Sequence, residues 1–187
     1  MSMSLDEIGG WFPAENRAEL EKLIVENEVK SVLEIGSFLG LSAAWFAQRV
    51  ERVTCVDRWH EPASHDSGNN LNATLRRFGI PRDFYEIFMS NMREFGVANK
   101  VFPVRGDSTA VHGSIGDHDL VYVDGDHSLE GCRLDLKFYG PKAKRVLCGD
   151  DFLPRPEFGV IEAVEEYAKK ISVTLHVQVP FWWMDKR

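Results

Sequence analysis

The chain has 187 residues and a formal net charge of −7, with 44% hydrophobic and 27% charged residues. This composition is that of a globular protein and excludes wholesale disorder, and the length fits a single domain over residues 1–187. The longest apolar runs are far shorter than the ~20 residues of a membrane-spanning helix, and the acidic balance argues against a nucleic-acid-binding face.

The amino-terminal sequence and the cysteines favour a cytoplasmic protein. Residues 1–10 contain neither the basic stretch nor the apolar stretch of a secretion signal. Cys55, Cys132 and Cys148 are odd in number, widely spaced and outside any C-x-x-C motif, so we expect reduced and mostly buried thiols. Because the apolar runs are short and the net charge is negative, we expect no membrane partner and no nucleic-acid partner.

Short apolar strands alternate with helical patterns along the chain. Residues 1–30 form an amino-terminal helical segment with Pro13 near the helix start. The expected strands cover 31–35, 52–56, 100–104, 118–123, 145–148, 172–179 and 181–185. The expected helices cover 41–50, 70–78, 83–95, 129–138 and 158–170. Five strand-then-helix units predict an α/β fold, doubly wound around a mostly parallel sheet. The last two strands are joined too tightly for a crossover, so this pair should be antiparallel.

Polar and acidic residues follow every strand of the parallel set. Ligands of such sheets bind beyond the carboxyl ends of the strands, which makes these positions the candidate site. The residues concerned are Gly36-Ser37, Asp57, Asp107-Ser108, Asp124–His127 and Asp150-Asp151.

The loop after the first strand has the pattern E-x-G-x-x-x-G, from Glu34 to Gly40. A dinucleotide site needs G-x-G-x-x-G, but Phe38 takes the middle position and would crowd a diphosphate. Glu34 would repel phosphate and could instead position an ammonium group. Asp57 follows Gly36 by 21 residues, where it could accept hydrogen bonds from a ribose. The loop alone is also compatible with a plain strand-to-helix turn, but together with Asp57 it predicts a nucleoside pocket.

Four carboxylates form two clusters, Asp124 with Asp126 and Asp150 with Asp151, separated by one helix and one strand. That interval is one crossover between neighbouring parallel strands, so the clusters should lie side by side. Close carboxylates repel one another unless a cation is present, and oxygen ligands favour Mg²⁺ or Ca²⁺. The alternative for Asp126 is a helix cap.

The segments VLEIGSFLGLS, VTCVD, RGDS, VYVDGDHSLEG and GDDF resemble the class I S-adenosylmethionine-dependent methyltransferases. More narrowly, they resemble the small metal-dependent O-methyltransferases related to macrocin O-methyltransferase and, more distantly, catechol O-methyltransferase. The resemblance covers about residues 30–175. It implies a Rossmann-like methyltransferase fold with seven strands and an antiparallel last strand.

The resemblance also implies roles for single residues. The implied cofactor-binding residues are Glu34, Gly36, Ser37, Gly40, Asp57, Asp107, Ser108 and Asp124. The implied metal ligands are Asp124, Asp150 and Asp151, and Asp126 is the implied general base, with His127 as its competitor or a supporting partner. By its residue type, His127 could be a ligand, a base or a simple hydrogen-bonded residue. Trp59 follows a strand end and is expected to pack against the adenosine or the acceptor.

These features predict an enzyme that uses S-adenosyl-L-methionine and Mg²⁺ to methylate a small-molecule hydroxyl, such as that of a sugar, a glycoside or a polyketide-like acceptor. The alternatives are a metal-independent N- or carboxyl-methyltransferase, a nicotinamide-dependent oxidoreductase and a non-catalytic nucleoside-binding module. Residues 58–95 are the expected acceptor or lid segment. Residues 152–158 or a partner subunit could also supply it, so a homo-oligomer is an open expectation.

Overall fold

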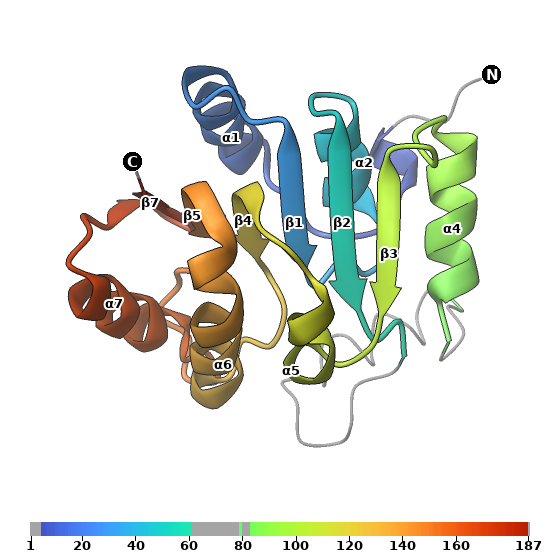
Figure 1. Cartoon of the computed structure of the whole chain (residues 1–187). Helices are drawn as coiled ribbons and strands as arrows, with labels where there is room; N and C mark the ends of the chain where they lie inside the picture. The colour runs from blue at the N-terminus through green and yellow to red at the C-terminus, as the bar shows by residue number, and fades with distance from the viewer. Residues whose placement is uncertain (1–4, 61–78, 80–82, 187) are drawn as a thin grey trace.

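The computed structural model describes residues 5–60, 79 and 83–186, and the expected helix at 70–78 and most of the expected lid segment lie outside these residues. The chain forms a seven-stranded sheet in the order β3-β2-β1-β4-β5-β7-β6 (Figure 1). The strands are β1 (Ser31–Ile35), β2 (Arg52–Asp57), β3 (Val101–Arg105), β4 (His118–Val123), β5 (Ala143–Gly149), β6 (His176–Gln178) and β7 (Phe181–Asp185).

Strand directions confirm the predicted fold class. Strands β1 to β5 pair with one another in parallel, β7 runs antiparallel to β5, and β6 runs antiparallel to β7. The expected strand at 172–179 is shorter than predicted, because the preceding helix continues to Ile171 and Ser172 ends it in a left-handed conformation with φ 56°.

Helices cover both faces of the sheet (Figure 1). One face carries α1 (Ala14–Glu26), α2 (Leu41–Ala47) and α4 (Tyr85–Glu94), which pack into one core cluster. The other face carries α5 (Ser108–Val111), α6 (Leu129–Tyr139) and α7 (Val160–Ile171), which pack into a second cluster. Successive strand residues point to opposite faces of the sheet, and both faces are covered by helices. The strands therefore carry apolar residues toward both faces, because their side chains fill both clusters.

The buried residues of β1 and β7 show this alternation directly. Val32 belongs to the first cluster and Leu33 to the second, and both are fully buried. Trp182 is fully buried in the second cluster, whereas Trp183 packs from the edge against the first. The three cysteines are buried free thiols, as predicted.

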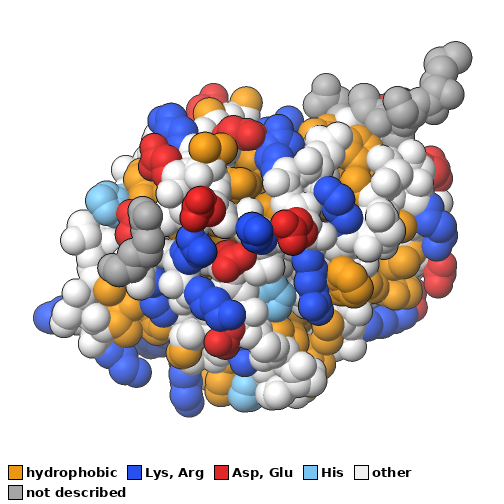
Figure 2. Space-filling view, turned by 45° about the horizontal axis from the view of Figure 1, so that its top comes forward, with side chains coloured by type: hydrophobic (Ala, Val, Ile, Leu, Met, Phe, Trp, Pro, Cys, Tyr) orange, Lys and Arg blue, Asp and Glu red, His pale blue; other side chains and the backbone are white. Residues whose placement is uncertain are grey.

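The two ends of the sheet differ in chemistry. At the amino ends of the strands, ion pairs join Lys30 to Glu51 and Arg145 to Asp119, and Figure 2 shows Lys, Arg, Asp and Glu interspersed over this face. The carboxyl ends carry the predicted site residues. None of the helices in the described part of the chain is long and apolar enough to cross a bilayer.

Candidate functional site

Two glycines shape the loop between β1 and α2. Gly36 and Gly40 both have φ +91°, a backbone conformation that side chains with a Cβ rarely adopt. A Cβ at Gly36 would lie 2.0 Å from the backbone oxygen of Asp124, and one at Gly40 would lie 2.4 Å from Cε of Met92. Gly36 therefore lets the β1 loop touch the β4 loop, and Gly40 lets it pack against α4.

Phe38, between these glycines, is held in a left-handed conformation with φ 46°. Its N–H donates to Oδ2 of Asp57 at 2.8 Å, and its carbonyl oxygen accepts from Nε1 of Trp59 at 2.8 Å. These two hydrogen bonds offset the backbone strain of a non-glycine residue in this region. The loop therefore keeps a bulky residue where a dinucleotide loop needs glycine.

Asp57 and Trp59, at the end of β2, differ in how far they are buried. Asp57 is half-buried, and Oδ1 accepts the Trp59 N–H at 2.6 Å. Burial raises its pKa, against the backbone hydrogen bonds that lower it. Trp59 is fully buried, with its ring centroid 4.6 Å from that of Phe88. This indole has no exposed surface and supports the Phe38 loop through its Nε1–H. Its contact with adenosine or acceptor stays a prediction.

Glu34 is a fully buried carboxyl beneath the loop. Its Oε2 accepts a hydrogen bond from Oγ of Ser37 at 2.5 Å, while Oε1 has no hydrogen-bond partner among the described residues. Burial raises the pKa of Glu34 to about 7, although the hydroxyl of Ser37 lowers it. An unpartnered buried acceptor oxygen is costly, so this site is suited to a donor from a ligand.

The β3 end places Asp107 and Ser108 in different environments. Asp107 is exposed, and its Oδ1 accepts from the backbone N–H of Thr109 at 2.9 Å, which caps α5. Ser108 is half-buried and donates to Oδ1 of Asp135 at 2.6 Å. Asp135 was missed by sequence reasoning. The available signal was its position beside Leu136, on the apolar face of the predicted helix.

An acidic cluster lies where β4 and β5 end side by side, since Val123 is paired with Gly149. Asp124, His127 and Asp151 bring one ligand atom each within 4.8 Å of one another. Nε2 of His127 lies 2.9 Å from Oδ2 of Asp151 and 3.5 Å from Oδ1 of Asp124. The adjacency of the two predicted carboxylate clusters is thus observed.

Electrostatics within the cluster follow from burial and mutual contact. Burial raises the pKa of Asp124 to about 7, against the hydrogen bond from His127. Burial by itself lowers the pKa of His127, but the hydrogen bonds and charges of Asp124 and Asp151 outweigh this and raise it to about 10. The imidazolium therefore neutralises part of the charge of two carboxylates that would otherwise repel each other.

The predicted metal and base residues are only partly brought together. Asp150 is 8% exposed and its Oδ1 accepts the backbone N–H of Asp151 at 2.8 Å, outside the group of three ligand atoms. Asp126 is exposed and its Oδ1 accepts the Ser128 N–H at 2.8 Å, while Ser128 caps α6. Asp126 therefore holds the turn that precedes α6, while Ser128 rather than Asp126 is the N-cap of the helix. His127, one of whose predicted roles was that of a ligand, enters the group of three ligand atoms, whereas Asp150 does not.

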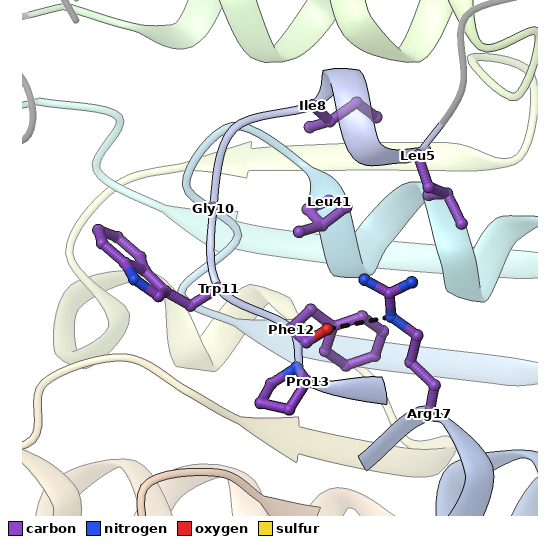
Figure 3. Close-up of a pocket in the computed structure, with 8 residues that line it drawn as sticks. All are labelled: Leu5, Ile8, Gly10, Trp11, Phe12, Pro13, Arg17 and Leu41. Atoms are coloured by element: carbon purple, nitrogen blue, oxygen red, sulfur yellow. Dashed lines mark hydrogen bonds between the residues drawn. The ribbon is translucent and has the colours of Figure 1, made fainter. Parts of the chain in front are cut away.

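The amino-terminal segment reaches the glycine loop, which sequence reasoning also missed. The Trp11 ring stacks on Phe38 with centroids 6.2 Å apart, and 63% of Trp11 is exposed. A cavity of about 370 Å³ lies beside it, and Figure 3 shows the Arg17 side chain reaching over Phe12 toward Leu41. The lining residues are Leu5, Ile8, Gly10, Trp11, Phe12, Pro13, Arg17 and Leu41. Residues 5–13 therefore flank the site in addition to the segments expected from sequence.

Comparison with known proteins shows the family to which this sequence and fold are similar. The sequence matches the family described as "Methyltransferase domain" over residues 33–151, and no curated protein matches it. Among solved structures, the O-methyltransferase NovP is 18% identical with a TM-score of 0.68, over 91% of this chain and 78% of NovP. An O-methyltransferase from Bacillus cereus in complex with SAH is 14% identical with a TM-score of 0.65, over 96% of this chain and 84% of its own. TomG from Streptomyces achromogenes, in complex with SAM, is 18% identical with a TM-score of 0.61, over 94% and 80%.

The family match covers more than half of the 187 residues and contains both the glycine loop and the acidic cluster. The chain belongs to the methyltransferase-domain family. The resemblance drawn from the sequence motifs is confirmed at the level of the class I methyltransferase fold.

Proposed function

We propose that this protein transfers a methyl group from S-adenosylmethionine to a hydroxyl of a small molecule, with Mg²⁺ bound at the acidic cluster. The observation that carries the proposal is the contact between the two candidate sites. Gly36 in the glycine loop lies directly against the backbone of Asp124, the first residue of the cluster. A donor bound on the loop and an acceptor bound at the cluster would therefore lie close together, which is the main requirement of a direct group transfer.

Several side chains support S-adenosylmethionine as the donor. The unpartnered Oε1 of Glu34 could accept a hydrogen bond from the cofactor ammonium, and Asp57 retains lone pairs for a ribose hydroxyl. Two of the similar O-methyltransferase structures contain SAM or SAH. We assign Gly36, Ser37 and Gly40 to the cofactor loop. Asp107 and Ser108 would flank the adenine.

The donor atoms of the cluster support a divalent cation. Carboxylate oxygens of Asp124 and Asp151 suit Mg²⁺, while the Nε2 of His127 also suits softer metals such as Mn²⁺ or Zn²⁺. A bound cation would lower the pKa of an acceptor hydroxyl and hold its oxygen in place. Asp126 and His127 remain the candidates for accepting the proton. His127 would serve as the base only through an Nε2 that neither binds the cation nor carries its own proton, whereas Asp126 is an exposed carboxylate whose Oδ1 accepts the Ser128 N–H.

Isothermal titration calorimetry with S-adenosylhomocysteine and with Mg²⁺ tests the proposal. We expect wild type to bind both, and Asp151→Asn to lose Mg²⁺ binding. Asp117→Asn is the matched control, because Asp117 is exposed at the opposite end of β4. Failure of wild type to bind the nucleoside would contradict the whole proposal. Methyl transfer that is unchanged in EDTA and in Asp151→Asn would contradict the role of the metal only.

A metal-independent methyltransferase acting on a nitrogen or a carboxylate is the second candidate. The observation that favours it is His127, which already bridges Asp124 and Asp151 as an internal cation. Under this alternative the three side chains form a structural ion-pair network. Mg²⁺ would then produce no heat on titration and no change in the melting temperature.

A further inference from the structure

Helix α6 carries two buried polar residues one turn apart on the same face. Asp135 is 2% exposed and Tyr139 is fully buried, and their four-residue spacing places both side chains along one stripe of the helix. The other buried positions of this stripe are apolar. Two polar groups on a core-facing stripe are unfavourable unless each has a partner.

Both residues find that partner in Ser108, the first residue after the β3 loop. The Ser108 hydroxyl donates to Oδ1 of Asp135 at 2.6 Å. The Tyr139 hydroxyl donates to the backbone oxygen of Ser108, also at 2.6 Å. The side chain and the main chain of one residue are thus fixed by two successive turns of α6, which lies beside α5 in Figure 1.

The same carboxylate contacts the loop after β4. A Cβ on Gly125 would lie 3.0 Å from Oδ2 of Asp135. Burial raises the pKa of Asp135 to about 6, and the Ser108 hydroxyl and the backbone N–H of Asp126 act in the opposite direction. Asp135 therefore lies between Ser108 on one side and the Asp124–His127 loop on the other.

This bridge matters because the sheet does not connect these loops. β2 and β1 lie between β3 and β4 in the strand order, so no strand pairing sets Ser108 relative to Asp124. The β1 loop touches Asp124 through Gly36, but Ser108 is bound to α6. Hydrogen bonds to Asp135 and Tyr139 thus connect the adenine side of the proposed pocket to the acidic cluster.

We propose that Asp135 and Tyr139 are positioning residues that couple nucleoside binding at the β3 loop to divalent-cation binding at the acidic cluster. The inference rests on the proposed function, because it assumes that the protein binds both the nucleoside cofactor and the divalent cation. Such coupling is reciprocal: Mg²⁺ should tighten the binding of S-adenosylhomocysteine by the same factor by which S-adenosylhomocysteine tightens that of Mg²⁺.

Calorimetric titrations of S-adenosylhomocysteine with and without Mg²⁺ test the coupling. We expect wild type to show a factor of about 5 or more, the lower end of typical coupling, and Asp135→Ala and Tyr139→Phe to reduce this factor to near one. Asp135→Asn should restore much of it, because its amide can accept from the Asp126 N–H while donating to the Ser108 hydroxyl. Tyr139→Phe keeps the ring and removes only the hydroxyl, so it tests the same link with little change in packing.

Asp119→Asn is the matched control, because Asp119 also accepts hydrogen bonds from a serine, Ser31, but at the opposite end of the sheet. It should lower the melting temperature and leave the coupling factor unchanged. If Asp135→Ala and Tyr139→Phe lower stability but keep the wild-type affinity and coupling, they are merely structural and the inference is wrong. A wild type that binds both ligands without coupling also overturns it. A wild type that binds no S-adenosylhomocysteine overturns the proposed function itself.

Discussion

Replacement of Gly36 by alanine tests the contact on which the proposed site depends. The new Cβ would lie 2.0 Å from the Asp124 oxygen, whereas an ordinary C···O contact is at least ~3.3 Å. The two loops must therefore separate by roughly 1 Å. A left-handed alanine costs about 1–2 kcal/mol, and overpacking adds about 1–3 kcal/mol. We expect Gly36→Ala to lower the free energy of unfolding by about 2–5 kcal/mol.

Other glycines of the chain separate these two contributions. Gly96 has φ +78°, and a Cβ added there would have nothing within 4 Å, so Gly96→Ala reports the backbone strain alone. Gly113 has open space and no left-handed φ, so Gly113→Ala should change stability by less than about 0.5 kcal/mol. Urea unfolding of the three variants gives each contribution by difference. A displacement of about 1 Å at a reacting centre can reduce the rate about 100-fold, so methyl transfer should fall steeply in Gly36→Ala only.

The refuting result is specific. If Gly36→Ala were no less stable than Gly96→Ala, the loop would have room for a Cβ, and the close contact between the glycine loop and Asp124 would be wrong. If stability fell as expected but S-adenosylhomocysteine affinity and methyl transfer were unchanged, the contact would be structural and would not position the site.

Three further substitutions test the glycine loop and the end of β5. Glu34→Gln removes a carboxyl whose pKa burial raises to about 7. A raised carboxyl pKa stabilises the fold at a pH below the unfolded pKa, and this stabilisation is lost as the pH rises through 7. In urea unfolding, the free energy of unfolding of wild type should therefore fall by up to about 3 kcal/mol more than that of Glu34→Gln between pH 4.5 and pH 8. Equal losses would show that the pKa is not raised. Trp59→Phe removes the hydrogen bond to the Phe38 oxygen and should cost about 1–2 kcal/mol of stability with little change in S-adenosylhomocysteine affinity; a large affinity loss at full stability would instead place Trp59 at the ligand. Trp182→Phe removes the donor to the Asp150 oxygen and should lower the free energy of unfolding by about 1–3 kcal/mol, which thermal unfolding would detect.

Sequence patterns predicted the elements well where periodicity and strand chemistry agree. The strands at Ser31–Ile35 and His118–Val123 have the predicted bounds, because short apolar runs ending in glycine or aspartate have few alternative structures. The helix from Leu41 ends at Ala47 rather than at residue 50. Helix ends depend on competing hydrogen bonds of the last turn, which the pattern does not contain.

The candidate site was predicted by position and corrected by geometry. The order of strands and the rule that ligands bind beyond their carboxyl ends brought Asp124 and Asp151 together. Both Asp150 and Asp151 were predicted as ligands, but neighbouring residues in a turn point in different directions, and Asp151, with a left-handed backbone of φ 58°, enters the group of ligand atoms whereas Asp150 does not. The same is true of His127, which enters the cluster, and of Asp126, which accepts the Ser128 N–H instead.

The sequence by itself determined the layered α/β fold, the strand ends that carry the site and the absence of a dinucleotide loop, because these depend on residue type and spacing along the chain. Only the tertiary structure decided which side chains meet. Trp59 became a buried support, Asp135 a link between two loops, and residues 5–13 a neighbour of Phe38. Each of these contacts joins residues that are distant in the chain and are brought together only when the whole sheet folds. Their side chains are oriented by packing that no local pattern encodes.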